Sequence, residues 1–318
     1  MKIRRWKKMM VAVRSFDRPA SALLRKAAAI AQRFGATLDV VHVSTLAQEA
    51  FRIPGLLDGA ETLEQLAVIQ QQRLDKLVRP LMRSGIKVAC LSVMDYPPAD
   101  GIVRQVQKRQ PDLLIVQSQR HAPLARVFLS NTDWELIRNC PCPLWLVKTG
   151  KLKPALSVLA AVDPFHTFAK PADLDNEILA VAGQVVGTGA GRMGICHAWT
   201  LPQDAVSTMG EMTLVPASAA EVRRHKVQVA EATRRLSKQY AIARKDQLLV
   251  EGDPAHGIPQ LARRWKADLL VMGALSRRGL KRIFIGNTAE RALDEVTCDV
   301  LVIKPRGFRS PVSGRSRR

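Results

Sequence analysis

The chain has 318 residues, of which 47% are hydrophobic and 24% are charged, and its formal net charge is +21. This composition is typical of globular proteins and excludes a mainly disordered chain. No run reaches the ~18 consecutive apolar residues that a membrane-spanning helix needs. The amino-terminal apolar run, residues 9–13, is too short for a signal peptide. Five cysteines form no disulfide framework, so we expect a cytoplasmic protein with reduced thiols and no membrane span.

The first half of the chain is predicted to alternate five strands with four helices. Short apolar runs predict the strands, at residues 9–13, 37–43, 87–92, 112–116 and 144–147. Apolar residues at helical spacing predict the helices, near residues 23–34, 61–84, 99–109 and 132–139. Near-continuous apolar strands that alternate with helices indicate a parallel sheet covered on both faces.

The second half repeats the first. Residues 96–148 align without a gap with residues 252–304, with 14 identities. Strands are expected at residues 157–162, 193–199, 247–250, 268–272 and 300–303. Helices are expected near residues 171–186, 218–240, 256–265 and 288–296. A repeat of this length is a duplicated domain, so the predicted fold class is α/β, with two tandem doubly wound five-stranded parallel sheets.

One insert follows the second strand of each half, at residues 44–60 in the first half and 201–217 in the second. Both are apolar for loops. Each insert therefore packs over its own sheet, or lines an apolar cavity or a partner surface.

Ligands of doubly wound sheets bind beyond the carboxyl ends of the strands, where the strand order reverses. This rule directs attention to the residues after the first and fourth strands of each half. In the second half, Gly273 ends the fourth strand and allows a ligand to approach the backbone. Gly286 precedes a helix whose unpaired N–H groups and dipole favour a phosphate. Asn287 and Glu290 have capping-box spacing, so a plain helix start fits these residues equally well.

The segments GDPAHGI (252–258), ADLLVMG (267–273) and GNTAERALDEVTCDVLVIKP (286–305) resemble the universal stress protein family in its tandem-domain type. The resemblance implies one such domain at 1–150, a second at 151–306 and a basic tail at 307–318. In nucleotide-binding members of the family, the loop after strand four wraps the phosphates, and an Asp after strand one helps to hold the adenosine.

For this chain, the resemblance implies a ligand or nucleotide site composed of Asp163, Gly273, Ser276, Gly286, Asn287 and Thr288. Two positions depart from the family pattern. Ser276 stands where the second glycine is expected, and Asn287 stands where Ser or Thr is expected, with Thr288 one residue later as an alternative hydroxyl. The residues themselves require no cofactor, and the resemblance makes ATP or another adenine nucleotide the candidate ligand of an altered site.

The first half departs further from the family pattern. Arg14 occupies the place of the Asp, and Gln117, Arg120 and Ser130 replace the three glycines. Ser130 and Asp133 keep capping-box spacing. We therefore expect the helix start to be retained and the phosphate cradle to be lost in this half.

In the strand order of the family, the last strands of the two halves, residues 144–147 and 300–303, lie at sheet edges. Edge strands carry unpaired backbone groups that favour pairing. We expect these strands to pair, either within the chain or between two chains.

No nucleophile elbow, Walker motif, zinc-ligand pattern or catalytic triad is recognisable. The expected function is that of a non-catalytic stress-response binding protein, with a small ligand and a protein partner or second copy as candidate partners. Three alternatives remain open: a binding protein for an apolar ligand or a protein partner without nucleotide, a nucleic-acid-associated protein that uses its basic ends, and a weak ATPase.

Three smaller features have plain structural interpretations. His42 and His197 occupy matching positions at the end of the second strand of each half and are expected to be strand-end residues. The fingerprint-like GAGRMG (189–194) leads from a helix into a strand, which is the wrong context for dinucleotide binding. Cys140 and Cys142 have neither the two-residue spacing of redox pairs nor a second ligand pair for zinc.

Overall fold

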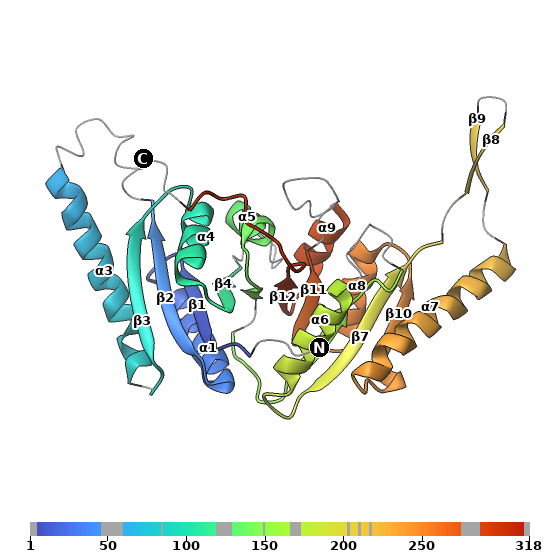
Figure 1. Ribbon diagram of the computed structural model, residues 1–318, viewed down its shortest axis with the longest axis horizontal. Coiled ribbons are helices and arrows are strands. Elements are labelled where there is room, and N and C mark those ends of the chain that lie inside the picture. The colour runs from blue at the N-terminus through green and yellow to red at the C-terminus, as the bar shows by residue number, and fades with distance from the viewer. Residues whose placement is uncertain are drawn as a thin grey trace.

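The computed structural model describes residues 5–45, 60–83, 85–118, 129–148, 150–165, 173–201, 204–208, 211–215, 218–274 and 287–314. Within these segments the chain forms two similar α/β repeats that lie side by side (Figure 1). The elements of the first repeat are β1 (Lys8–Val13), α1 (Arg18–Phe34), β2 (Thr37–Ser44), α3 (Ala60–Met82), β3 (Val88–Met94), α4 (Pro98–Arg109), β4 (Leu113–Gln117), α5 (Asn131–Asn139) and β5 (Leu144–Val147).

The second repeat has the same order of elements and two additions. Its elements are β6 (Ser157–Ala161), α6 (Asp173–Val186), β7 (Arg192–Trp199), β8 (Asp204–Thr208), β9 (Glu211–Val215), α7 (Ala219–Gln239), the 3₁₀ turn η1 (Arg244–Asp246), β10 (Gln247–Glu251), α8 (Pro254–Arg264), β11 (Leu269–Gly273), α9 (Asn287–Glu295) and β12 (Asp299–Ile303). The predicted alternation of strands and helices is confirmed in both repeats. The GAGRMG segment lies between α6 and β7, as its helix-to-strand context predicted.

All strands of the two repeats except β8 and β9 belong to one ten-stranded sheet, in the order β10-β7-β6-β11-β12-β5-β4-β1-β2-β3. Pairing is parallel within each repeat, as predicted. The two five-stranded halves join where β12 pairs antiparallel with β5, with Leu301 opposite Trp145. The expected pairing of the last strands is therefore confirmed within one chain.

Helices cover both faces of this sheet, and strand residues alternate between the two resulting cores. Met9, Val11 and Val13 of β1 pack on the face covered by α1, α3 and α6. Met10 and Ala12 pack on the opposite face, covered by α4, α5, α8 and α9. Successive side chains of a strand point to opposite faces, so a strand that is buried on both sides must be apolar throughout.

The first helix shows how local sequence sets the boundaries. The carboxylate of Asp17 accepts a hydrogen bond from the backbone N–H of Ala20 and caps the start of α1. Gly35 ends the helix in the left-handed conformation, with φ of 64°, which glycine adopts without steric cost.

The insert of the second repeat contains the antiparallel hairpin β8–β9, which the sequence did not predict. The hairpin stands away from the ten-stranded sheet (Figure 1). The interpretation that this insert packs over its own sheet is therefore wrong for the hairpin. Residues 46–59 of the first-repeat insert, predicted at 44–60, lie outside the described residues.

The chain after β12 returns to the first repeat. The backbone carbonyl of Val312 accepts a 3.0 Å hydrogen bond from Nε2 of Gln107 on α4, and Phe308 packs against the core. Residues 307–314 thus lie against the fold.

Candidate functional site

The strand order reverses between β1 and β4 in the first repeat and between β6 and β11 in the second. The carboxyl ends of these strands define two equivalent crevices, where ligands of doubly wound sheets bind. Arg14 follows β1 at the first crevice. Asp163 lies two residues after β6 at the second, where Gly273 ends β11.

Two histidines show that Arg14 and Asp163 are structurally equivalent. Nδ1 of His42 donates a 3.0 Å hydrogen bond to the carbonyl of Val13, and Nδ1 of His197 donates a 2.9 Å bond to the carbonyl of Val162. Arg14 and Asp163 are the next residues after these two carbonyls. Burial lowers the pKa of His42, although its backbone hydrogen bond opposes the shift. Both histidines are buried strand-end residues, as expected.

Arg14 occupies the first crevice. Its Nη1 donates a 3.0 Å hydrogen bond to Oγ of Ser130, and its Nη2 pairs with the carboxylate of Asp133. Asp133 is fully buried. A helix N-terminus is an anion site because its N–H groups and dipole favour negative charge. At the start of α5 the Asp133 carboxylate already occupies this anion site, and the Arg14 guanidinium pairs with it.

The capping box predicted at Ser130 and Asp133 is present. Oγ of Ser130 accepts from the backbone N–H of Asp133 at 3.3 Å, and the Asp133 carboxylate accepts from the backbone N–H of Ser130 at 2.9 Å. The helix start is retained, with Arg14 bonded to both capping residues.

At the second crevice a carboxylate takes the place of the guanidinium. Asp163 is half-buried, and its backbone N–H donates a 3.1 Å hydrogen bond to Oδ1 of Asp175 in the first turn of α6. This bond ties the strand-end loop to the helix that packs beside it. The charge at the mouth of the second crevice is therefore opposite to that at the first.

An aromatic cluster lies beside Asp163, formed by Phe165, His197, Trp199 and His225. The ring of Phe165 stacks on His225 with centroids 5.7 Å apart and lies 6.1 Å from His197. The ring of Trp199 lies 5.3 Å from His225. Phe165 is 41% exposed, whereas Trp199 is buried. The cluster thus presents one accessible aromatic ring next to the carboxylate.

Sequence reasoning missed Phe165, Trp199 and His225 as members of this site. One signal was available, because Phe16 and Phe165 follow Val13 and Val162 at the same distance in the two repeats. In the first repeat the Phe16 ring lies 4.5 Å from that of His42. His225 comes from α7, and its proximity has no sequence signal.

The remaining candidate residues are only partly described. Gly273 ends β11, and a Cβ added there would lie 2.7 Å from Cδ2 of Leu174 on α6, so packing already accounts for this glycine. Ser276 and Gly286 lie outside the described residues. Asn287 and Thr288 begin α9, but their side chains also lie outside the description. The structure therefore places Asp163 and Gly273 at one crevice and leaves the phosphate loop itself untested.

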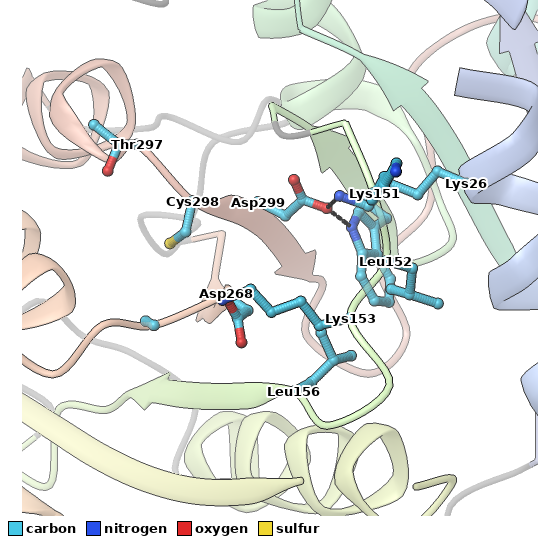
Figure 2. Close-up of a pocket in the computed structure, with 11 residues that line it drawn as sticks. Lys26, Lys151, Leu152, Lys153, Leu156, Asp268, Thr297, Cys298 and Asp299 are labelled. Atoms are coloured by element: carbon cyan, nitrogen blue, oxygen red, sulfur yellow. Dashed lines mark hydrogen bonds and ion pairs between the residues drawn. The ribbon is translucent and has the colours of Figure 1, made fainter. Parts of the chain in front are cut away.

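Two cavities lie at the junction of the repeats. One of about 250 Å³ is lined by residues that include Lys26, Asp268 and Asp299 (Figure 2). The other, of about 390 Å³, is lined by residues that include Cys142 and Lys304. Among the side chains that the structure describes, no three His, Cys, Asp or Glu residues gather as a metal site. No helix in the described segments has the length and apolar character needed to cross a membrane.

Comparisons with known proteins agree with this architecture. A family model described as the universal stress protein family matches residues 5–148 and 182–304. Universal stress protein E of Salmonella typhi is 29% identical over 305 residues, which are 93% of this chain and 93% of that protein. Universal stress protein E of Escherichia coli strain K12 is 28% identical over 305 residues, 93% of this chain and 92% of that protein.

Two solved structures are similar along most of the chain. A functionally unknown protein from Pseudomonas aeruginosa PAO1 matches with a TM-score of 0.70 and 24% identity, covering 94% of this chain and 93% of that one. A universal stress protein from Archaeoglobus fulgidus DSM 4304 matches with a TM-score of 0.62 and 17% identity, covering 93% and 98%. At these identities the two structures establish the shared fold.

Proposed function

Because the chain belongs to the universal stress protein family, we propose that it is a non-catalytic stress-response protein that binds a small ligand in one repeat only. The binding crevice is that of the second repeat, between β6 and β11. An adenine nucleotide is the first candidate ligand. The first repeat serves as a structural partner.

One observation carries this proposal: the equivalent positions of the two crevices hold Arg14 and Asp163. The carboxylate of Asp133 occupies the anion position at the start of α5, and Arg14 is bonded to Asp133 and Ser130. A ligand with phosphate groups would have to displace a buried ion pair there, which costs several kcal/mol when one charge is left unpaired.

The chemistry beside Asp163 supports a ligand with a planar ring and hydrogen-bond donors. A carboxylate accepts bonds from ribose hydroxyls or amino groups. The exposed ring of Phe165 offers a surface for offset stacking, and the ring of His225 supports it from behind.

The first experiment is to purify the protein natively, denature it and identify the released small molecules by mass spectrometry. ATP, ADP or another adenine nucleotide in a stoichiometric amount is the expected result. A lipid-like molecule would overturn the nucleotide proposal in favour of the apolar-ligand alternative.

Calorimetric titration with ATP then locates the site with two matched variants. We expect Asp163→Ala to weaken ATP binding by about tenfold to a hundredfold, the range for hydrogen bonds to a charged group. Arg14→Gln, at the equivalent position of the other repeat, should leave the affinity unchanged. The opposite pattern would place the site in the first repeat, and absence of ATP binding to the unmodified protein would favour partner binding. Phosphate release from ATP in the same samples would overturn the non-catalytic assignment.

A further inference from the structure

Two thiols meet at the end of α5. Cys140 caps the helix, and Cys142 follows it after a single proline. Their sulfur atoms lie 3.6 Å apart, in hydrogen-bonding contact. Cys140 is fully buried and Cys142 is 9% exposed. The one-residue spacing did not suggest a redox pair in the sequence, but the fold brings the two sulfurs together.

Lys304 reaches this pair from the other repeat. Its Nζ donates hydrogen bonds to the backbone carbonyls of Ile137 and Arg138, the latter at 3.1 Å, in the last turn of α5. Its ammonium also lies 4.8 Å from the ring centroid of Phe308. A positive charge is thus held next to two thiols that the first repeat contributes.

The environment of Cys140 affects its thiol pKa differently from those of the other four cysteines, all of which lie in described segments. Burial opposes a charge on Cys140. The hydrogen bonds from the thiol and the backbone N–H of Cys142, together with the Lys304 ammonium, outweigh burial, so the pKa of Cys140 falls below its ordinary value. Burial raises the pKa of Cys90 to about 11 and that of Cys298 to about 12, and it also raises the pKa of Cys196.

The pair is also connected to the exterior. Cys142 and Lys304 line the cavity of about 390 Å³ at the repeat junction. A small oxidant can therefore approach the sulfur of Cys142 and the amine of Lys304 from the same space.

We propose that Cys140 and Cys142 form a redox-active dithiol that a hydroperoxide oxidises to an intramolecular disulfide, with Lys304 as the residue that promotes the reaction. The proton between the two sulfurs passes to Cys140, so the sulfur of Cys142, which lines the cavity, is the anion that attacks the terminal OH oxygen of the hydroperoxide ROOH, and the O–O bond breaks. The departing RO⁻ takes a proton from the Lys304 ammonium and leaves as ROH, and a sulfenic acid remains on the sulfur.

The second thiol then attacks the sulfenic sulfur and displaces hydroxide, which takes the thiol proton and leaves as water. The two sulfurs lose two electrons, and the peroxide oxygens gain them. Thiolates are the reactive form of cysteine, so a neighbouring cation accelerates the first step. Because Cys140 caps the end of α5, the disulfide forms where Lys304 joins the two repeats.

The test uses the full-length reduced protein treated with hydrogen peroxide, quenched with N-ethylmaleimide and digested with trypsin. Cleavage after Arg138 and Lys148 gives one peptide, residues 139–148, that contains both cysteines. We expect this peptide to lose 2 Da and to carry no maleimide, while Cys196 and Cys298 remain fully alkylated. Cys140→Ser should abolish the loss of 2 Da. Preferential oxidation of Cys90, or oxidation that produces no loss of 2 Da, would overturn the proposal.

The role of Lys304 is tested against its counterpart Lys148. Lys148 binds the last turn of α9 in the same way, donating to the carbonyls of Leu293 and Val296. Lys304→Met should slow disulfide formation severalfold, because loss of the neighbouring cation lowers the thiolate fraction. Lys148→Met loses an equivalent helix cap and should leave the rate unchanged. Equal slowing in both variants would show that lost packing is responsible, and the assigned role of Lys304 would be wrong.

Discussion

Lys26 and Asp299 form an ion pair of 2.6 Å across the boundary between the two repeats, and each side chain is only 2% exposed (Figure 2). The same carboxylate accepts a 2.8 Å hydrogen bond from the indole of Trp145 and a 3.0 Å bond from the backbone N–H of Lys148. All three donors belong to the first repeat, whereas Asp299 begins β12 in the second. One carboxylate therefore holds the seam where β12 meets β5.

Replacement of Asp299 should destabilise the protein strongly. Asp299→Ala leaves a buried ammonium and two buried N–H donors without their acceptor, and removal of one partner of a buried pair costs about 3–5 kcal/mol. The free energy of unfolding in urea measures this effect. Lys153→Met is the control, because Lys153 forms a pair of the same 2.6 Å length with Asp268 but is 65% exposed. Exposed pairs contribute about 0–1 kcal/mol, so similar losses in the two variants would contradict the role assigned to Asp299.

Stability should rise with pH between about 7 and 9 because of two buried lysines. Burial lowers the pKa of Lys148 to about 8 and that of Lys304 to about 7, from an ordinary value of 10.5. Below pH 7 both amines are charged in the fold and carry their full desolvation cost. As the pH rises through these values the folded amines lose their protons, while the unfolded chain keeps them until about 10.5. The unfolded state then binds more protons, so the free energy of unfolding increases.

The expected slope is on the order of 1 kcal/mol per pH unit for each lysine. A neutral amine keeps two N–H donors, enough for both carbonyls that it caps. Urea unfolding at pH 7, 8 and 9 measures the slope, which should flatten in the double variant Lys148→Met/Lys304→Met. Above pH 9 the unfolded thiols ionise, whereas burial raises the pKa of Cys90 to about 11 and that of Cys298 to about 12, and it also raises that of Cys196, so these three folded thiols outnumber the two lysines. The rise of the free energy of unfolding with pH therefore reverses above pH 9. A slope between pH 7 and 9 that is unchanged in the double variant would refute its assignment to the two lysines.

Gly273→Ala should destabilise the second repeat even without any ligand. The added methyl group would lie 2.7 Å from Cδ2 and 3.0 Å from Cγ of Leu174. Overpacking of this kind costs about 1–3 kcal/mol. Thermal unfolding of the ligand-free protein measures the loss, and Gly273→Ala/Leu174→Ala should be less destabilised than the sum of its two single variants. Strict additivity would show that contact with Leu174 is not the cause of the loss.

Much of the architecture was predictable from the repeat. The gapless alignment of residues 96–148 with 252–304 implied the same strands and helices in each half. The strand order implied by the family resemblance placed residues 144–147 and 300–303 at sheet edges, which led to the expected pairing of β5 with β12. The hairpin β8–β9 was not predicted, because its strands are only five residues long and the first, DAVST, shows no clear alternation of apolar and polar residues.

The candidate site was predictable only in part. The exchange of Asp for Arg14 and the capping box at Ser130 and Asp133 were visible in the sequence. That Arg14 bonds these two residues was not visible, because they lie more than a hundred positions away along the chain. The ring cluster at Phe165 likewise combines the loop after β6, strand β7 and helix α7.

Local patterns in this chain specify its elements, their duplication and the residue types at each strand end, because helix and strand periodicity and capping depend on neighbours a few positions apart. Only the tertiary structure decides which side chains of different elements pair with one another. The hydrogen bonds of Lys148 and Lys304 to helix carbonyls of the other repeat, and the Lys26–Asp299 pair, all depend on the antiparallel seam between β12 and β5. This seam brings the ends of the two repeats together in a buried environment, where the charges must find partners in the other half.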